Sequence, residues 1–313
     1  MVSDAIERFV KLPPRPKVAF LGSPSEAAIV LERLLEHHME PVVVLTNPPS
    51  RRTRGGSLSE TPVGEIATQN GLDLIHDINL LPTVSFDLGV VVAYGHIIRE
   101  PILALAPFVN LHFSLLPRWR GAAPVERAIL ALDEKIGVAL MEIGPGLDEG
   151  AIFDVREIEL GFADTAQGTR KKLAHLGAKM LVNSLEIGGQ AFVNAQPQKG
   201  KVTYAAKLTK LDRQIDFGLS ARQVDALVRV GGAWTTIGTK RIHVTKTKVS
   251  EPTEQDSSLL ELKVGSLSGS LVKCGEGYLE LCMVQPEGKT SMPAKDWLNG
   301  LHISQDEMIF GSR

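Results

Sequence analysis

From Lys17 to about Gly189 the sequence alternates between short apolar runs and longer stretches whose apolar residues recur at helical spacing. KVAFLG (17–22) is a β-branched and aromatic run that ends in glycine, which predicts a buried strand. SPSEAAIVLERLLEHH follows, with Ser23 as a capping residue and Pro24 in the first turn, which predicts a helix. The same alternation predicts strands at 41–46, 72–77, 88–95, 108–116 and 136–143. It predicts helices at 61–70 and 165–187, and a further helix that runs through 128–132.

Strands that alternate with helices predict an α/β fold with a doubly wound, mostly parallel sheet of the Rossmann-like kind. Ligands of such sheets bind in the crevice beyond the carboxyl ends of the strands. Gly22, Gly95 and the segment after Asn110 lie near predicted strand ends. The dinucleotide fingerprint G-x-G-x-x-G is absent after the first strand, which disfavours NAD as the ligand.

The composition of the sequence changes after about Gly189. Residues 190–203 are rich in Gly, Asn, Gln and Pro and indicate a linker. Beyond one helical stretch at 220–230, short alternating segments predict a small antiparallel β-barrel, here expected to be OB-like. The expected organisation is therefore an extension at 1–16, a catalytic domain at 17–189, the linker, and a C-terminal domain at 204–313.

Composition narrows the class of protein. The 313 residues carry a formal charge of −2, which gives no global nucleic-acid footprint. Cys274 and Cys282 have no partners at zinc spacing, so we expect no metal site. A disulfide between them is one interpretation, and two free, buried thiols are the one that we expect. No segment has the ~18 apolar residues of a membrane span, and the first sixteen residues lack the apolar run of a signal peptide, so we expect a cytoplasmic protein that does not bind membranes.

The polar residues that could take part in a reaction lie in and after the fifth and sixth predicted strands. Asn110 and His112 are two residues apart, so strand alternation puts them on one face. A carboxamide can donate to a developing oxyanion, and an imidazole can handle a proton near neutral pH. Asp148, in the glycine-rich segment GPGLDEG, could reach His112 and favour the imidazolium. From these residues alone, a hydrogen-bonded Asn–His pair and a turn-forming aspartate remain open interpretations.

A longer stretch carries a resemblance. SLLPRWRGAAPVERAIL, with Asn-x-His before it and GLDEG after it, resembles the signature of the methionyl-tRNA formyltransferase family. VVVAYG, DTAQGTRKKLAHLGAKMLVNSL and VTYAAKLTKLDRQIDF also match, so the similarity runs from Lys17 to Met308. The triad Asn110, His112 and Asp148 fits the wider folate-dependent formyltransferases.

The resemblance implies the fold, the activity and the cosubstrate. Asn110 and His112 would surround the formyl carbon of 10-formyltetrahydrofolate, Asp148 would support His112, and no metal is implied. The residues implied to bind the folate are Ser114, Leu115, Leu116, Pro117 and Gly95. The acceptor would be the amine of methionine carried on initiator tRNA, and we expect a monomer.

A tRNA partner would meet two basic regions. Arg51, Arg52 and Arg54 lie in the polar loop NPPSRRTRGGSLSE, which matches the family's acceptor-stem loop in length and suits phosphate contact. The C-terminal part from Lys199 onward has sixteen Lys and Arg against thirteen Asp and Glu. Its densest cluster is Lys240, Arg241, Lys246 and Lys248. On charge alone, both regions also fit a solvated surface.

The chain departs from the family at some positions. Pro49-Ser50 stands where the family often has an acidic-basic pair, and the family's tryptophan-proline element is reduced to Ala233-Trp234-Thr235. Two other functions remain open beside formylation of methionyl-tRNA. One is a formyltransferase for a small amine, which needs neither the arginine loop nor a second domain. The other is a non-catalytic RNA-binding or folate-sensing module, which has no need of the triad.

Overall fold

The computed structural model describes residues 4–51, 57–238, 240–250, 262–301 and 309–311. The chain divides into two compact units. The first comprises Met1–Val125, Lys135–Glu159 and Gly168–Ala206, and the second comprises Glu126–Glu134, Leu160–Gln167 and Lys207–Arg313. The segment predicted to be a linker, 190–203, thus belongs with the first unit, and the predicted domain boundaries stay a prediction.

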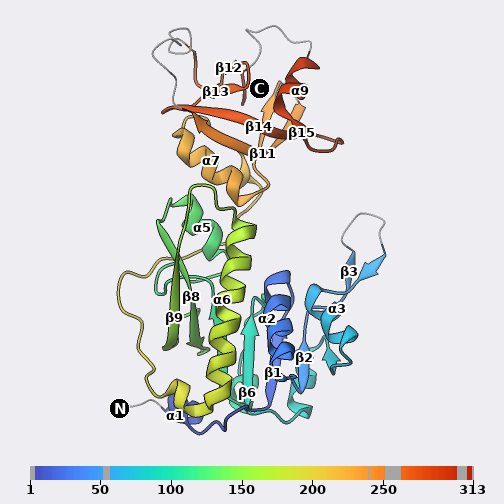
Figure 1. Ribbon diagram of the computed structural model, residues 1–313, viewed down its shortest axis with the longest axis vertical. Coiled ribbons are helices and arrows are strands. Elements are labelled where there is room, and N and C mark those ends of the chain that lie inside the picture. Colours follow the sequence, from blue (N-terminus) through green and yellow to red (C-terminus); the bar gives the residue numbers. More distant parts are fainter. Residues whose placement is uncertain (1–3, 52–56, 239, 251–261, 302–308, 312–313) are drawn as a thin grey trace. The chain divides into compact units, whose positions relative to one another are not determined.

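The first unit is built on a seven-stranded sheet with the order β5-β2-β1-β6-β7-β8-β9 (Figure 1). β5, β2, β1, β6 and β7 run parallel, and β8 and β9 extend the sheet antiparallel. This confirms the predicted mostly parallel sheet. The strands are β1 (Val18–Gly22), β2 (Val43–Leu45), β5 (Leu74–Ile75), β6 (Leu88–Val92), β7 (Phe108–His112), β8 (Lys135–Glu142) and β9 (Ile152–Glu159).

Two strands differ from the sequence-based expectation. β7 ends at His112 rather than at residue 116, because the Ser114 amide turns back to donate to the His112 carbonyl. β9 is not predicted at all, since this edge strand is largely exposed and lacks a continuous apolar run. The central strands β1 and β6 are buried along their whole length, as expected for strands covered on both faces.

Three helices of the first unit, α2, α3 and α6, pack along its sheet where the alternation predicts helices. The cap of α3 is the Thr61 hydroxyl, which accepts from the Gly64 amide. Gly177 lets α6 approach the sheet, because a Cβ there would stand 3.2 Å from Leu111 and 3.1 Å from Val138. The bounds are α2 (Ser25–Glu36), α3 (Pro62–Gln69), α4 (Ile102–Leu105), α5 (Pro124–Leu130), α6 (Ala166–Ile187) and the 3₁₀ turns η1 (Ile78–Thr83) and η2 (Gly188–Phe192); β3 (Ser50–Arg51) and β4 (Leu58–Ser59) form a small hairpin.

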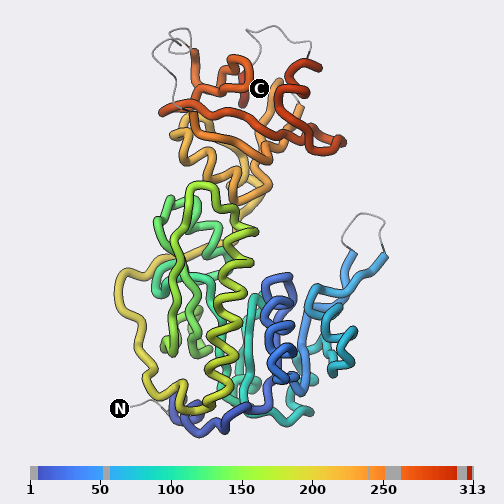
Figure 2. The backbone as a smooth tube through the Cα atoms, viewed as in Figure 1, coloured from blue at the N-terminus to red at the C-terminus, as the bar shows by residue number. Residues whose placement is uncertain are grey.

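The predicted N-terminal extension is part of the first unit. α1 (Asp4–Val10) lies beside η2 at the end of α6 (Figure 2). Phe9 is 1% exposed and packs against Phe153 and Phe192, with ring centroids 4.8 and 5.3 Å away. The Arg8 guanidinium donates to the carbonyls of Leu103 and Ala104. This segment therefore supplies core and hydrogen bonds to the sheet domain.

The second unit contains a six-stranded antiparallel sheet with the order β10-β11-β14-β13-β12 and β15 beside β14. Its two edges are bridged by the chain near the C-terminus, since Ile237 pairs with Phe310 and Ser266 with Ile309. This closure agrees with the predicted small barrel. The elements are η3 (Leu211–Arg213), α7 (Ala221–Val230), β10 (Trp234–Ile237), β11 (Lys240–Ser250), β12 (Leu267–Ser268), β13 (Leu271–Lys273), β14 (Tyr278–Pro286), β15 (Met292–Pro293) and α9 (Ala294–Asn299).

Helix α7 confirms the predicted helix at 220–230. Ser220 and Gln223 form a reciprocal capping box at its start. Its Asp225 carboxylate accepts from Arg229 Nε at 2.9 Å and from the Thr247 hydroxyl at 2.7 Å, which ties the helix to β11. Both cysteines are free, Cys274 buried and Cys282 half-buried. No helix among the described residues is long and apolar enough to cross a bilayer.

Candidate active site

The predicted triad residues come together at the end of β7. Asn110 and His112 occupy alternate positions of that strand, with Asn110 half-buried and His112 only 5% exposed. The Asp148 carboxylate, in the loop between β8 and β9, places Oδ2 3.6 Å from His112 Nδ1. Residues 36 positions apart in the sequence thus share one site because β7 and β8 are neighbours in the sheet.

The contacts of His112 assign its two ring nitrogens. Nε2 lies 2.8 Å from the Trp119 carbonyl oxygen. Because a carbonyl only accepts, Nε2 carries a proton and donates it there. Nδ1, the other ring nitrogen, faces the Asp148 carboxylate.

Asp148 is held in an uncommon backbone conformation. Its φ is +48°, in the left-handed region that few residues other than glycine adopt, although aspartate tolerates it better than most. Its Oδ2 atom accepts a hydrogen bond of 2.8 Å from the Gly121 amide. Gly121 has a φ of +115°, and a Cβ there would stand 3.0 Å from the Ala205 carbonyl oxygen. The carboxylate position thus depends on a turn that requires glycine.

Asn110 offers hydrogen-bond donors to a ligand. Within the described part of the chain, its carboxamide makes no hydrogen bond, whereas the backbone of Asn110 pairs with Met141 of β8. A half-buried carboxamide with free N–H groups beside an imidazole is suited to stabilise an oxyanion.

The predicted folate run is anchored internally. Ser114 is fully buried, and its hydroxyl donates to the Arg118 carbonyl at 2.6 Å. Leu116 packs with Ala139 and Met141, and its peptide bond to Pro117 is cis. Leu115 is half-buried against Gly137 of β8. A ligand at this run would therefore meet mainly its backbone.

Gly95 lies at a neighbouring strand end. It has a φ of +83°, is exposed, and has open space where a Cβ would stand. Burial raises the pKa of the preceding Tyr94, and Asp77 adds to the rise. Tyr94 therefore stays a neutral phenol across the physiological range.

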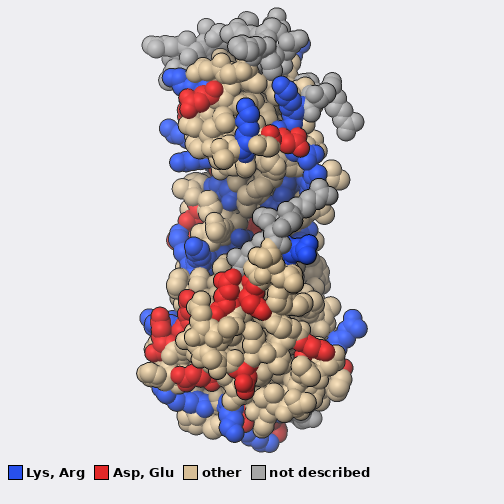
Figure 3. All heavy atoms as spheres, turned by 90° about the vertical axis from the view of Figure 1, so that its right-hand side faces the viewer, with Lys and Arg blue, Asp and Glu red and all other residues tan. Residues whose placement is uncertain are grey.

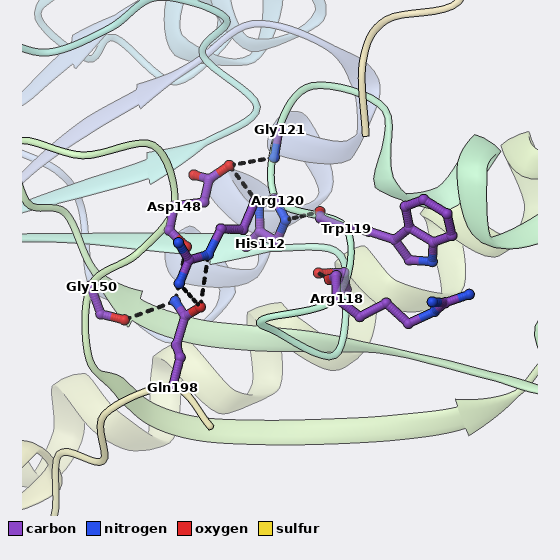
Figure 4. A network of polar contacts seen from close by, with 9 residues as sticks. His112, Arg118, Trp119, Arg120, Gly121, Asp148, Gly150 and Gln198 are labelled. Atoms are coloured by element: carbon purple, nitrogen blue, oxygen red, sulfur yellow. Dashed lines mark hydrogen bonds and ion pairs between the residues drawn. The ribbon is translucent and has the colours of Figure 1, made fainter. Parts of the chain in front are cut away.

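Sequence reasoning missed a network around His112 and Asp148 (Figure 4). Trp119 donates its amide to the Thr203 hydroxyl at 2.9 Å, and Arg120 reaches Gln198 with two guanidinium nitrogens. Gln198 and Thr203 belong to the segment predicted to be a linker. The only sequence signal for a role in the site would have been their polar side chains. Glutamine and threonine are common in polar linker segments, so they do not indicate such a role.

A second polar cluster was also missed, at the ends of β1, β2 and β6. Thr46 Oγ1 lies 3.1 Å from Ser23 Oγ and 2.6 Å from Thr61 Oγ1, and Ser23 also accepts from the Asn47 amide. Asn47 Oδ1 lies 2.7 Å from Nε2 of His96. These bonds fix the first residues of the arginine loop to the sheet.

The predicted tRNA residues lie in both units. Arg51 is exposed in β3, whereas Arg52 and Arg54 lie outside the described residues. On β11, Lys240, Lys246 and Lys248 are exposed. Arg241 is half-buried, and its guanidinium stacks 4.3 Å from the Trp234 ring. On the face drawn in Figure 3, Lys and Arg outnumber Asp and Glu over the C-terminal unit.

Comparisons with known proteins agree with this fold. Residues 16–185 match the family described as formyl transferase, and residues 207–302 match the formyl transferase C-terminal domain. The methionyl-tRNA formyltransferase of Corynebacterium diphtheriae is 37% identical over 308 residues, which cover 92% of this chain and 98% of that protein.

Solved structures share the fold at low identity. A methionyl-tRNA formyltransferase from Clostridium thermocellum aligns with a TM-score of 0.56 at 14% identity, over 74% of this chain and 93% of that one. A sugar 3N-formyl transferase, solved with dTDP and 5-N-formyl-THF, aligns with a TM-score of 0.64 at 15% identity, over 88% of this chain and 98% of that one. With more than a third of its residues identical to a relative over nearly its full length, this chain belongs to the methionyl-tRNA formyltransferase family.

Proposed function

We propose that this chain transfers the formyl group of 10-formyltetrahydrofolate to the α-amino group of methionyl-initiator tRNA, giving formylmethionyl-tRNA. The observation that carries the proposal is the buried His112, whose Nδ1 atom faces the Asp148 carboxylate beside the free carboxamide of Asn110. Membership of the family names the donor, the acceptor and the reaction class.

The site residues would act on a tetrahedral intermediate. The neutral amine attacks the formyl carbon, so one C–N bond forms, the bond to the folate nitrogen breaks, and the amine's proton ends on that nitrogen. Asn110 donates an N–H to the oxyanion, and the imidazolium of His112 supplies positive charge beside it. Asp148 holds that imidazolium and takes the amine proton in transit, through a water molecule.

The flanking residues would position the two substrates. The run from Ser114 to Pro117 and the open Gly95 would contact the folate, mainly through backbone atoms. The arginines Arg51, Arg52 and Arg54 and the β11 cluster would contact tRNA phosphates. We further propose that the protein acts as a monomer in the cytoplasm, where charged tRNA and reduced folate are available.

One assay tests the activity. The purified chain is incubated with 10-formyltetrahydrofolate and methionyl-initiator tRNA, with free methionine and a glycinamide nucleotide in parallel reactions. We expect formylation of the charged tRNA alone, and a loss of about 10²–10⁴ in rate for His112→Ala.

The other outcomes select between the competing functions. Turnover of a small amine in place of the tRNA would mean that the site works on a different acceptor. Folate binding without turnover of any amine would overturn the enzymatic proposal and favour a binding module.

A further inference from the structure

Gln198 uses its whole side chain amide inside the active-site region (Figure 4). Its Nε2 atom donates to the Asp148 carbonyl at 2.8 Å and to the Gly150 carbonyl at 3.0 Å. Its Oε1 atom accepts from Arg120 Nε at 3.0 Å and from an Arg120 terminal nitrogen at 2.8 Å. A primary amide has two N–H groups and two lone pairs, so all four hydrogen-bonding positions are occupied.

The backbone around Gln198 is also fixed. Gln196 exchanges two backbone hydrogen bonds with Ile152 of β9, at 2.8 and 2.9 Å. A little further on, Arg120 donates its amide to the Thr203 carbonyl, and its carbonyl accepts from the Ala205 amide. Gln198 therefore stands between two points at which its segment is paired to the sheet domain.

The partners of Gln198 are the two segments that position the catalytic carboxylate. One is the turn around Glu149, in which the backbone carbonyls of Asp148 and Gly150 both accept from Gln198 Nε2. The other is the signature segment at Arg120, directly before the Gly121 amide that binds Asp148 Oδ2. The Arg120 side chain is 12% exposed, so its bonds to Oε1 are largely shielded from water.

The chemistry of these contacts requires an amide. A glutamate would keep the acceptor for Arg120 but would face two carbonyl oxygens with a charge and no donor. A methionine would fill similar space but would leave the two carbonyls without their donor and leave the Arg120 guanidinium only its 3.9 Å ion pair with Glu149. Either change would release the Asp148 turn, which has a φ of +48° and depends on its surroundings to hold it.

We propose that Gln198 is a positioning residue for formyl transfer: it locks the Asp148 turn to the Arg120 segment and so places the Asp148 carboxylate between His112 Nδ1 and the Gly121 amide. The inference rests on the proposed function for the reaction but adds a residue outside the triad. It also gives the segment predicted to be a linker a part in the active site.

Steady-state kinetics of Gln198→Met provide the first test. We expect kcat to fall about 10- to 100-fold, since a carboxylate displaced by about 1 Å is enough for such a loss. The KM values for both substrates should stay within about threefold. Gln196→Met is the matched control, because among the described residues the Gln196 side chain bonds only the backbone carbonyl of Asn194, two residues before it. It should keep wild-type kcat.

Gln198→Glu is the second variant, for the case in which Gln198→Met does not fold. It retains an acceptor for Arg120 but has no donor for the two carbonyls, and should lose kcat to a similar extent. Wild-type kcat in folded Gln198→Glu would show that the two donor bonds are dispensable and would overturn the proposal.

A double-mutant cycle separates positioning from general stability. If Gln198 acts through Asp148, adding Gln198→Met to Asp148→Asn should lower kcat by less than about twofold further. Full additivity of the two losses would assign Gln198 a structural role only.

An NMR measurement makes the test independent of the substrate. The Gly121 amide proton should lie downfield in the wild type, and should move upfield in Gln198→Met and not in Gln196→Met. An unmoved Gly121 resonance would overturn the inference. Failure of the wild type to formylate charged tRNA would instead refute the proposed function, while the resonance would still report on Gln198.

Discussion

At the scale of single residues, the site depends on atoms held in place by unusual backbone conformations. Asp148 and Trp119, which bind the two nitrogens of His112, both have positive φ values, +48° and +64°. Such conformations cost of order 1–3 kcal/mol each and persist where the surroundings over-determine them. Here the surroundings are the Gly121 amide, Thr203 and Gln198.

Replacing Asp148 by asparagine should separate charge from shape. The amide oxygen can still accept from the Gly121 amide, but the negative charge beside His112 Nδ1 is lost. We expect kcat to fall about 10²–10⁴-fold with the fold intact, measured by steady-state formylation and circular dichroism. The surface carboxylate variant Asp154→Asn should keep wild-type activity; an equal loss there would point to a nonspecific effect.

Gly121→Ala should distort the same contact from the other side. A Cβ would stand 3.0 Å from the Ala205 carbonyl oxygen, on a residue with a φ of +115°. We expect kcat to fall about tenfold or more, because the amide that binds Asp148 must shift. Gly300→Ala serves as control, since its Cβ would meet nothing closer than 3.5 Å. Wild-type kinetics for Gly121→Ala would mean that this turn is not coupled to catalysis.

At the scale of elements, α1 and η2 show how segments outside the predicted catalytic domain complete it. Phe9, Phe153 and Phe192 come from α1, β9 and η2 and form one aromatic cluster. The Gly189 amide donates to the Leu12 carbonyl and the Arg15 amide to the Leu185 carbonyl. The segment from Phe9 to Arg15 thus closes the end of α6.

Phe9→Ala should therefore destabilise the first unit. Removing a fully buried phenylalanine costs about 3–5 kcal/mol through lost burial and the cavity left behind. We expect a lower midpoint for the thermal transition of this unit in calorimetry. Val10→Ala is the matched control, as Val10 is 42% exposed in the same helix, and should change the midpoint little. An unchanged midpoint for Phe9→Ala would mean that α1 is dispensable for the fold.

At the scale of the whole molecule, the formal charge of −2 hides an uneven distribution. Among the described strand partners of the exposed β11 lysines, Lys240 lies across from Ile237, Lys246 from Met283, and Lys248 from the acidic Glu280. A polyanion would bind this surface through long-range electrostatic interactions that salt screens, whereas the folate would bind through short-range contacts in its site.

Salt should accordingly weaken the binding of the two substrates to different extents. We expect KM for charged tRNA to rise steeply between low and physiological salt, while KM for the folate changes little. The double variant Lys246→Ala/Lys248→Ala should reduce the slope of log KM for tRNA against log salt concentration. The reduction should be about one for each phosphate that the variant no longer neutralises. Lys179→Ala, on the exposed side of α6, should leave the slope unchanged. An identical slope in the double variant would remove β11 from the tRNA-binding surface.

Much of this organisation follows from the sequence alone. Strands and helices of the first unit appear as two hydrophobic periods, because burial on both faces of a central strand demands a continuous apolar run and one-sided packing demands a helical stripe. Strand alternation likewise places Asn110 and His112 on one face. The family signature around Pro117 indicates the reaction without any knowledge of the geometry.

Other features were decided by the tertiary structure. The hydrogen bonds of Gln198 and Thr203 leave no periodic signal in their own segment. Their partners lie far away in sequence: Gln198 bonds Arg120 and Asp148, at separations of 78 and 50 residues. Local propensity cannot encode such pairs, since each bond becomes favourable only after the sheet has brought both segments together and excluded water. The sequence by itself thus determined the sheet and the reactive side chains, and the tertiary structure decided which neighbours hold those side chains in place.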